Sequence, residues 1–338
     1  MAPFVTVAAP KLVVAAYFPW YGTPSGPTGH WVHWKDGNGN VLVKDHPPYM
    51  YDSREPAAIN AELSAANLFG INAFAVSWWG VGSNEDGNLK ILLDTAASTN
   101  SPVKLAAQFE TTGLAGLGTS GVISQLAALM TSYSSHRSYL TVNGRPVVFI
   151  YNPAALTSDY SQWAAILANP AIASFNAMYI VDSFSDQAAA VFDGLYTFAP
   201  FGPSYPYDPI ALYNKYQSAS AVAKAHNKVF VPAVSPGFDD SVIRAPSMII
   251  PRTNHETYVG TWYIALSAQP DWVFIDSWNE WHEATELEPS SEYGTDYLYL
   301  TSVFSYFLRH PGTAVARPAV PARVLKAVGA TSLRGRLR

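Results

Sequence analysis

Short apolar stretches alternate along the chain with longer segments in which apolar residues recur at the spacing of a helix. Eight apolar, β-branched or aromatic runs predict strands at residues 12–17, 73–78, 103–109, 146–151, 178–182, 194–199, 228–234 and 272–278. The helical pattern predicts helices at residues 56–69, 88–98, 122–136, 159–167, 186–191, 209–226, 256–268 and 293–308. Each predicted strand is therefore followed by a helix.

This alternation predicts an α/β fold, a single (β/α)8 TIM barrel. Nearly continuous apolar strands are typical of a parallel sheet that is covered on both faces, and eight strand–helix pairs are the repeat of the barrel. A doubly wound open sheet is the alternative. We expect the barrel domain to span residues 1–310 and a Pro/Ala/Arg-rich C-terminal tail to occupy residues 311–338.

Two segments interrupt the alternation. Residues 22–54 are too long for an ordinary connection between strand and helix. Within them, two alternating runs at 30–34 and 41–43 flank a Gly- and Asn-rich turn and predict a β-hairpin. Residues 200–206 are rich in Pro, Gly and Tyr. Both segments follow the carboxyl end of a predicted strand, which is the face where barrel active sites lie.

Composition narrows the possible functions. The chain of 338 residues is 49% hydrophobic and 13% charged, with a formal net charge of −5, which excludes a disordered protein and argues against a nucleic-acid partner. Aromatic residues make up 14% of the chain and suit either a packed core or a cleft that stacks on sugars. The absence of cysteine excludes disulfides and a thiol nucleophile.

Localisation is only weakly constrained by the sequence. The first residues lack the features of a signal peptide, and no apolar run approaches the roughly 20 residues of a membrane helix. We therefore expect a soluble monomer with no membrane partner. A secreted or cell-surface protein whose signal peptide is missing from this chain is the favoured reading.

Polar and aromatic residues gather where the predicted strands end. Because loops at one face of a barrel converge, these residues are candidates to line one pocket. Trp78 and Trp79 point to opposite faces of their strand, so at most one of them can face the barrel mouth. The candidates at the strand ends are Tyr17, Trp20, Tyr21, Trp78, Trp79, Gln108, Glu110, Asn152 and Tyr196.

Two glutamates follow the last predicted strand. Glu280 and Glu283 are three residues apart, and in a helix or tight turn such a pair lies about 5–6 Å apart. Two acids this close, shielded by Trp278 and Trp281, should differ in pKa, so that one stays ionised while the other can donate a proton. Glycoside cleavage needs that division of labour. Alternatively, these acids form a solvated, charged helix start, and His282 either orients Glu283 or caps the turn.

Other kinds of site have less support. His30 and His33 could bind a metal, but no third and fourth ligand follows at a suitable spacing, so we expect no metal site. The sequence contains no Gly-rich phosphate loop, Gly-x-Ser-x-Gly elbow or His-Glu-x-x-His motif. The predicted substrate-binding set is completed by His33 and Trp34 of the hairpin and by Trp281 and His282 of the closing stretch.

These motifs resemble glycoside hydrolase family 99 and its related barrels, the endo-α-mannosidases and endo-α-mannanases. The similarity runs over roughly residues 12–305, and its most specific part is Trp278-Asn279-Glu280-Trp281-His282-Glu283, continuing to Leu287-Glu288-Pro289. It also rests on Ala16-Tyr17-Phe18-Pro19-Trp20-Tyr21-Gly22, Ser77-Trp78-Trp79-Gly80 and Pro236-Gly237-Phe238-Asp239-Asp240.

The resemblance implies a retaining, endo-acting hydrolase that works through the 2-hydroxyl of its substrate without a cofactor. Glu280 would act as base on that hydroxyl and give a 1,2-anhydro sugar, while Glu283 would protonate the leaving oxygen and later activate water. Tyr17 and the tryptophan of the second strand would line the site, and Glu110 would hold sugar hydroxyls.

The chain departs from the family pattern at two positions. Gln108 stands where the family has His, and Phe198 stands where the family often has Tyr. Both positions are expected to touch sugar, so the resemblance implies the chemistry more directly than the identity of the sugar.

We therefore predict a hydrolase that cleaves internal α-glycosidic bonds of a neutral polysaccharide or glycan, with a mannan-like substrate favoured. One alternative is a non-catalytic carbohydrate-binding barrel or an accessory domain in polysaccharide assembly. Another is an inverting hydrolase, which would need carboxyl groups about 6.5–9.5 Å apart.

Overall fold

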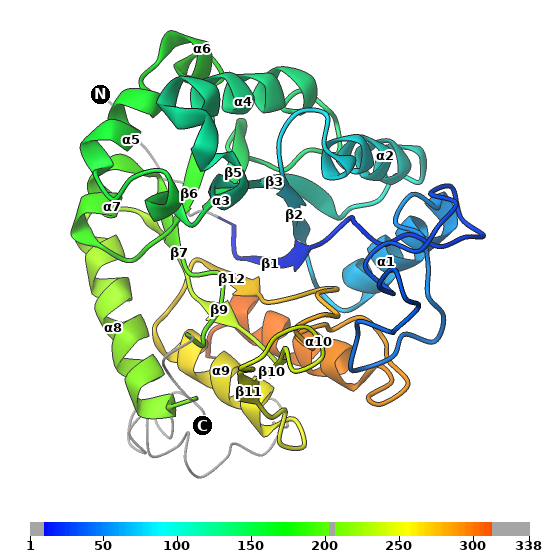
Figure 1. Cartoon of the computed structure of the whole chain (residues 1–338). Coiled ribbons are helices and arrows are strands. Elements are labelled where there is room, and N and C mark those ends of the chain that lie inside the picture. Colours follow the sequence, from blue (N-terminus) through cyan, green and yellow to red (C-terminus); the bar gives the residue numbers. More distant parts are fainter. Residues whose placement is uncertain (1–9, 203–206, 313–338) are drawn as a thin grey trace.

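The computed structural model describes residues 10–202 and 207–312 and shows a closed parallel barrel surrounded by helices (Figure 1). The (β/α)8 prediction is confirmed. Around the barrel, the order of strands is β8-β7-β6-β5-β3-β2-β1-β12-β9. Their bounds are β1 Leu12–Tyr17, β2 Ala73–Trp78, β3 Lys104–Glu110, β5 Arg145–Tyr151, β6 Met178–Asp182, β7 Gly194–Tyr196, β8 Val229–Val231, β9 Ala233–Val234 and β12 Trp272–Ile275.

The barrel closes through one interrupted strand. β8 and β9 are the two halves of the seventh predicted strand, separated by Pro232, which has no N–H to donate to a neighbouring strand. The first half pairs with β7 and the second with β12. The carbonyl of Pro232 still accepts a hydrogen bond from the N–H of Phe274 at 3.0 Å. One predicted strand therefore joins both edges of the sheet.

Helices cover the outside of the barrel (Figure 1). The main helices are α1 Pro56–Leu68, α2 Asn84–Ser98, α4 Gly118–Tyr133, α5 Tyr160–Leu167, α7 Asp186–Val191, α8 Pro209–Ala225, α9 Glu256–Ser267 and α10 Asp296–Arg309. The shorter elements are α3 Thr111–Leu114, η1 Ala115–Leu117, β4 Thr141–Val142, η2 Pro153–Ala155, α6 Pro170–Ala173, β10 Phe238–Asp239 and β11 Ile249–Ile250. The tail predicted from residue 311 lies, from residue 313 onward, outside the described residues.

Side-chain alternation divides the core into two layers. In β1, Val14 and Ala16 pack inside the barrel, whereas Val13, Ala15 and Tyr17 pack outward against the helices. All five side chains are buried. A strand with both faces covered must be apolar throughout, which explains the continuous apolar runs in the sequence.

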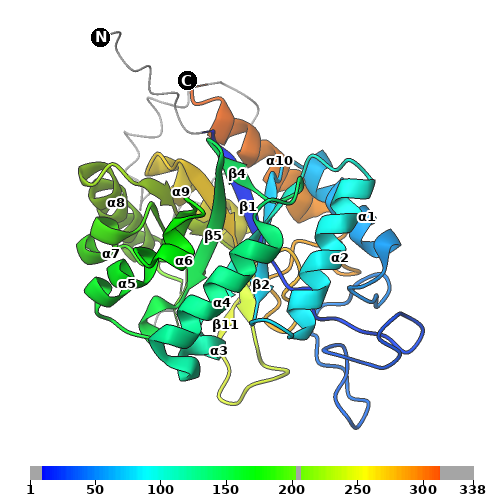
Figure 2. The same cartoon turned by 90° about the horizontal axis from the view of Figure 1, so that it is seen from above.

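The predicted hairpin in the loop between β1 and α1 forms only in part. Lys35 and Val41 make an isolated antiparallel bridge, and the N–H of Leu42 donates to the carbonyl of Trp34 at 3.0 Å. No regular strand forms among these residues, because His33 has a φ of 60° that breaks the extended run. In Figure 2 this blue loop and the yellow loop before β11 project from the same end of the barrel.

One apolar segment is longer than the sequence analysis expected. Thr111–Tyr133 has 23 residues and contains an 18-residue window with a mean hydropathy of 1.3, which by length and composition is enough to cross a membrane. In the structure this segment consists of α3, η1 and α4, with a backbone break at Gly118, whose φ is 65°. Leu126 and Met130 of α4 are buried in the core. The segment therefore packs as part of the helical layer of the barrel.

Candidate active site

A cavity of about 250 Å³ opens at the carboxyl end of the barrel strands. Its walls come from the last residues of β3 and β5, from the segments that follow β1, β2, β3, β7 and β12, and from the segment between β10 and β11. The lining residues are Phe18, Trp20, Trp79, Gln108, Glu110, Thr112, Tyr151, Phe198, Ile243, Arg244, Glu280, His282 and Glu283. Seven of the predicted site residues meet here: Trp20, Trp79, Gln108, Glu110, Glu280, His282 and Glu283.

Residues 279–283, which we call the carboxylate turn, are tied to the first strand of the barrel. The side chain of Asn279 accepts a hydrogen bond from the N–H of Phe18 at 2.8 Å and donates to the carbonyl of Phe18 at 3.1 Å. The hydroxyl of Ser277 accepts from the N–H of Glu280 at 2.7 Å. These contacts hold the turn at the barrel mouth without a helix.

Glu280 lies in an almost dry environment. It is 4% exposed, and its Oε1 accepts a hydrogen bond from the N–H of His282 at 3.1 Å. Burial, reinforced by the nearby charge of Glu283, holds the pKa of Glu280 well above its ordinary value. The imidazole Nδ1 of His282 lies 3.5 Å from the same oxygen, but burial lowers the pKa of His282, which favours a neutral ring.

Glu283 differs from Glu280 because a cation touches it. Arg244 donates from Nη1 to Oε1 of Glu283 at 2.7 Å and to Oδ2 of Asp240 at 2.9 Å. Burial raises the pKa of Glu283, and Arg244 opposes that rise. The carbonyl of Glu283 also accepts from the N–H of Asp239 at 2.7 Å, which fixes the backbone. The two glutamates therefore occupy unequal environments.

A third carboxyl group faces the same cavity from the end of β3. Glu110 Oε1 accepts hydrogen bonds from Gln108 Nε2 at 2.9 Å and from the hydroxyl of Ser77 at 2.7 Å. Burial raises the pKa of Glu110 to about 7 despite these donors. Trp79 in turn donates to the hydroxyl of Ser77 at 2.9 Å. Among the described residues, Oε1 of Gln108 has no partner, so it can accept a bond from a bound ligand.

Several predicted residues lie outside the cavity lining. Tyr17 and Trp78 point outward from their strands and donate to Glu62 at 2.6 Å and to Asp86 at 2.9 Å. Tyr196 is buried in the barrel interior, edge-on to Phe149. None of the three predicted side chains, Tyr17, Trp78 and Tyr196, lines the cavity.

A second group of predicted residues supports the cavity from behind. The predicted residues Tyr21, Trp34 and Trp281 are buried together with Tyr51, which the sequence analysis did not select, and we call these four residues the ring cluster. Tyr21 stacks on Trp34 with ring centroids 4.1 Å apart, and the N–H of Trp281 donates to the hydroxyl of Tyr21 at 3.1 Å. These rings hold the carboxylate turn and are not part of the cavity wall.

The last two predicted residues, His33 and Asn152, touch the lining residues. His33 stacks on Trp20 with ring centroids 4.5 Å apart, and its carbonyl lies 2.7 Å from Nε2 of His282. Asn152 donates from Nδ2 to the hydroxyl of Thr112 at 3.1 Å. Both therefore fix the position of neighbours in the wall.

The sequence analysis did not select five residues that line the cavity for the site: Phe18, Thr112, Tyr151, Ile243 and Arg244. Tyr151 ends β5, so its place at a strand end was a usable signal. Arg244 follows Asp240 by four residues in a segment without a periodic pattern, and its contact with Glu283 bridges 39 positions. Sequence spacing could not reveal that contact.

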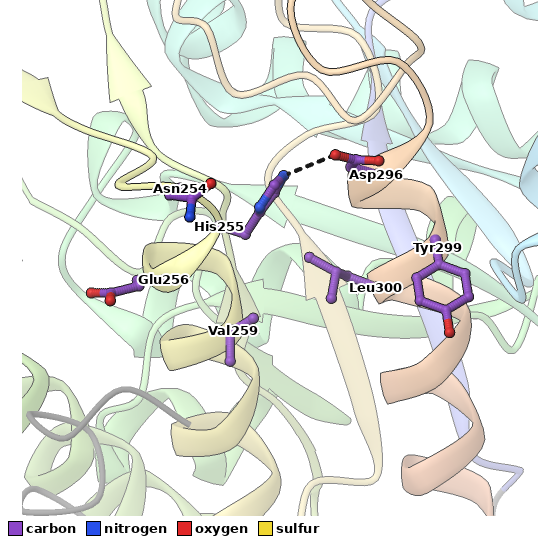
Figure 3. A pocket seen from close by; sticks show the side chains of 7 residues that line it. All are labelled: Asn254, His255, Glu256, Val259, Asp296, Tyr299 and Leu300. Carbon is purple, nitrogen blue, oxygen red and sulfur yellow. Dashed lines mark ion pairs between the residues drawn. The ribbon is translucent and has the colours of Figure 1, made fainter. Parts of the chain in front are cut away.

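A larger cavity, of about 400 Å³, lies between the N-terminal turns of α9 and α10 (Figure 3). In its lining, Nε2 of His255 lies 3.3 Å from Oδ2 of Asp296. None of its lining residues belongs to the carboxylate turn, and Glu256 is the only glutamate there. Among residues 10–202 and 207–312, no group of three or more His, Cys, Asp or Glu side chains is arranged to hold a metal ion.

Comparison with known proteins identifies the family. Residues 46–308 match the family Glycosyl hydrolase family 99. A Xenopus laevis glycoprotein endo-alpha-1,2-mannosidase is 28% identical over 316 residues, covering 80% of this chain and 68% of the relative. A Mus musculus glycoprotein endo-alpha-1,2-mannosidase-like protein is 26% identical over 327 residues, covering 81% and 68%.

Solved structures show the same fold. The GH99 endo-alpha-mannosidase from Bacteroides thetaiotaomicron superposes with a TM-score of 0.75 at 23% identity, covering 88% of this chain and 97% of that one. The match over residues 46–308 shows the family, and the superposition shows the barrel. The chain belongs to glycosyl hydrolase family 99 and is a glycoside hydrolase.

Proposed function

We propose that this hydrolase cleaves internal α-mannosidic bonds of a neutral glycan with retention of configuration, and that Glu280 and Glu283 carry the reaction. The observation that supports this most is that both carboxyl groups line one cavity at the barrel mouth, in unequal environments. The mannosidase names of the relatives support the choice of sugar.

In the proposed first step, Glu280 takes the proton from the 2-hydroxyl of the sugar. The freed oxygen attacks the anomeric carbon, the glycosidic bond breaks, and Glu283 gives its proton to the leaving oxygen. In the second step, Glu283 takes a proton from water, the water oxygen opens the 1,2-anhydro ring at the anomeric carbon, and Glu280 returns its proton to O2. Each carboxyl ends the cycle in its starting state, as acid–base catalysis requires.

The electrostatics of the two glutamates set a condition on this assignment. Glu283 must carry a proton to act as acid, but its hydrogen bond from Arg244 favours the ionised form. Glu280 must be ionised to act as base, but burial without a close cation favours the protonated form. The proposal therefore requires that the bound sugar displace Arg244 from Glu283, or that sugar binding move a proton from Glu280 to Glu283.

The polar groups around the pair suit an uncharged ligand. Glu110, Glu280 and Glu283 put three acids in the lining, and Arg244 is the only Lys or Arg side chain among the lining residues. A uronate polymer would bring further negative charge to this wall. Trp20 and Trp79 offer ring faces for sugar stacking.

The proposal is tested by replacing Glu283 with Gln and assaying release of oligosaccharides from a panel of α-mannans, α-glucans and mixed glycans. General acid catalysis contributes roughly 10²–10⁴-fold, so we expect Glu283→Gln to lose at least about 100-fold in kcat on the substrate that the wild type cleaves. Circular dichroism should show an unchanged fold. Near-normal activity of this variant would remove Glu283 from the mechanism, and binding without cleavage by the wild type would favour a carbohydrate-binding barrel.

A further inference from the structure

A second pair of carboxyl groups lies behind the carboxylate turn, outside the barrel. Glu62 on α1 is 5% exposed, and Glu288 follows the turn in the closing loop. The two side chains are within hydrogen-bonding reach of each other. They line a separate cavity of about 240 Å³ together with Pro47, Ala61 and Pro289, and the mechanism proposed above does not use them.

The hydrogen-bond donors around this pair leave one carboxylate oxygen unpaired among the described residues. Tyr17 donates to Oε2 of Glu62 at 2.6 Å, and Tyr51 and Trp281 donate to Oε2 of Glu288 at 2.8 and 3.1 Å. Oε1 of Glu62 has no hydrogen-bond donor among the described residues. Two ionised carboxylates within hydrogen-bonding reach would repel each other in a poorly solvated site, and one proton between them removes that repulsion.

Among the described residues, no cation is close enough to compensate the charge of this pair. The titratable groups that face the pair or share its cavity are Tyr17 from β1 and Tyr49 and Tyr51 from the loop before α1, with Tyr21 farther away. Within residues 10–202 and 207–312, neither Glu62 nor Glu288 has an ion-pair partner within 4.0 Å. In the part of the chain that the structure describes, a proton is therefore what can neutralise one of the two acids.

The pair is connected to the two chain neighbours of Glu280 by two hydrogen-bonded routes. Oε2 of Glu288 accepts from Trp281, which lies next to Glu280 in the chain. The same oxygen accepts from Tyr51, whose hydroxyl accepts from Asn279 Nδ2 at 3.2 Å. The residues on both sides of Glu280 are therefore held by one carboxylate oxygen.

We propose that Glu62 and Glu288 share one proton and that this shared proton holds the carboxylate turn in position. The role of the turn in catalysis rests on the proposed function, whereas the shared proton itself does not. Glu62 and Glu288 are in this account positioning residues, because they act through Tyr51 and Trp281 and do not line the active-site cavity.

The pH dependence follows from the direction of the shifts. Burial raises the pKa of Glu62 from 4.5 to about 7 and that of Glu288 well above its ordinary value. The native state therefore keeps a proton that the unfolded chain releases. The stabilisation is fully present below the unfolded pKa and is lost as the pH rises through about 7.

The test measures the unfolding equilibrium of the whole chain by denaturant titration from pH 5 to pH 8. In Glu62→Gln the amide keeps a donor facing Glu288 and an acceptor for Tyr17, but it cannot release a proton. We expect the folding equilibrium constant of the wild type to fall by up to about tenfold more per pH unit than that of Glu62→Gln, the value for one extra bound proton. Glu288→Gln should show the same flattening.

Glu55→Gln is the matched control, because Glu55 precedes α1 and faces neither acid. Its pH dependence should run parallel to the wild type. If Glu62→Gln and Glu288→Gln also run parallel to the wild type, the pair holds no shared proton and the proposal is wrong.

A second readout tests the link to the turn. On the substrate that the wild type cleaves, the alkaline decline of kcat should move to higher pH in Glu62→Gln and stay in place in Glu55→Gln, with KM little changed in both. An unmoved decline in Glu62→Gln would overturn the positioning role. Failure of the wild type to cleave any glycan would instead overturn the proposed function and leave the result of the unfolding titration intact.

Discussion

Arg244 determines how the two glutamates of the active site differ. It is the only Lys or Arg side chain in the cavity lining, and its hydrogen bond to Glu283 at 2.7 Å favours the charged form of that residue. Glu280 has no such partner among the described residues. The proposed roles therefore depend on what Arg244 does when sugar binds.

Replacing Arg244 with Met should raise the pKa of Glu283 and keep it protonated to higher pH. An opposite charge within hydrogen-bonding distance shifts a carboxyl pKa by roughly 1–3 units, and the half-exposed position of Arg244 favours the low end. We expect the alkaline limb of kcat/KM to move up by about one pH unit, measured on the cleaved substrate between pH 4 and pH 9.

Lys44→Met is the matched control for this prediction, because Lys44 pairs with Asp239 and does not line the cavity. It removes a positive charge near the site without touching Glu283. A downward shift in Arg244→Met, or equal shifts in both variants, would show that Glu283 is not the acid whose ionisation limits activity.

At the scale of elements, the alternation of side chains along a strand predicts which residues point into the barrel and which point outward to the helices. That rule excludes two of the predicted site residues from the cavity. Tyr17 shares its parity with Val13 and Ala15, which pack against helices, so it had to point outward. Trp78 follows the same rule with Phe74 and Val76. The pairing of Glu280 with Glu283 was readable, because it is local in the sequence.

The loops could not be sorted in the same way. Trp20 lines the cavity, whereas the neighbouring Tyr21 is buried behind it, and no period distinguishes them. Trp34 points toward the ring cluster because His33 has a positive φ, and no sequence pattern predicts that φ. The barrel and its acids were therefore predictable, while the second layer that supports them was not.

The ring cluster joins the long loop after β1 to the carboxylate turn. Trp34 is fully buried, and its Nε1 donates to the carbonyl of Tyr51 at 2.7 Å. We expect Trp34→Ala to lower the free energy of unfolding by about 3–5 kcal/mol, the usual cost of emptying a buried aromatic site. Denaturant unfolding measures this loss.

Trp31→Ala is the control within the same loop. Trp31 is 37% exposed, and Nζ of Lys35 lies 4.3 Å from the centroid of its ring. It should cost less than about 1 kcal/mol. At a temperature where both variants are folded, Trp34→Ala should also lose kcat, because its ring packs against Trp281 of the carboxylate turn. Equal losses in both variants would contradict the supporting role of the cluster.

At the scale of the whole molecule, the site is assembled from both ends of the chain. β1 lies before the family match over residues 46–308, but it pairs with β2 on one side and with β12 on the other, so it is an integral strand of the barrel. Phe18, the residue after β1, donates its N–H to the side chain of Asn279 in the carboxylate turn. The barrel therefore brings residues 261 positions apart into the hydrogen-bonding network on which the proposed chemistry depends.

The account as a whole states that Glu280 and Glu283 act on neighbouring oxygens of one sugar. The most direct measurement compares the cleaved α-mannoside with its 2-deoxy counterpart and follows the first-formed anomer by NMR. We predict that the parent substrate gives product of retained configuration and that the 2-deoxy compound loses kcat as severely as Glu280→Gln does with the parent. Cleavage of the 2-deoxy compound at an undiminished rate, or a first product of inverted configuration, would contradict the account.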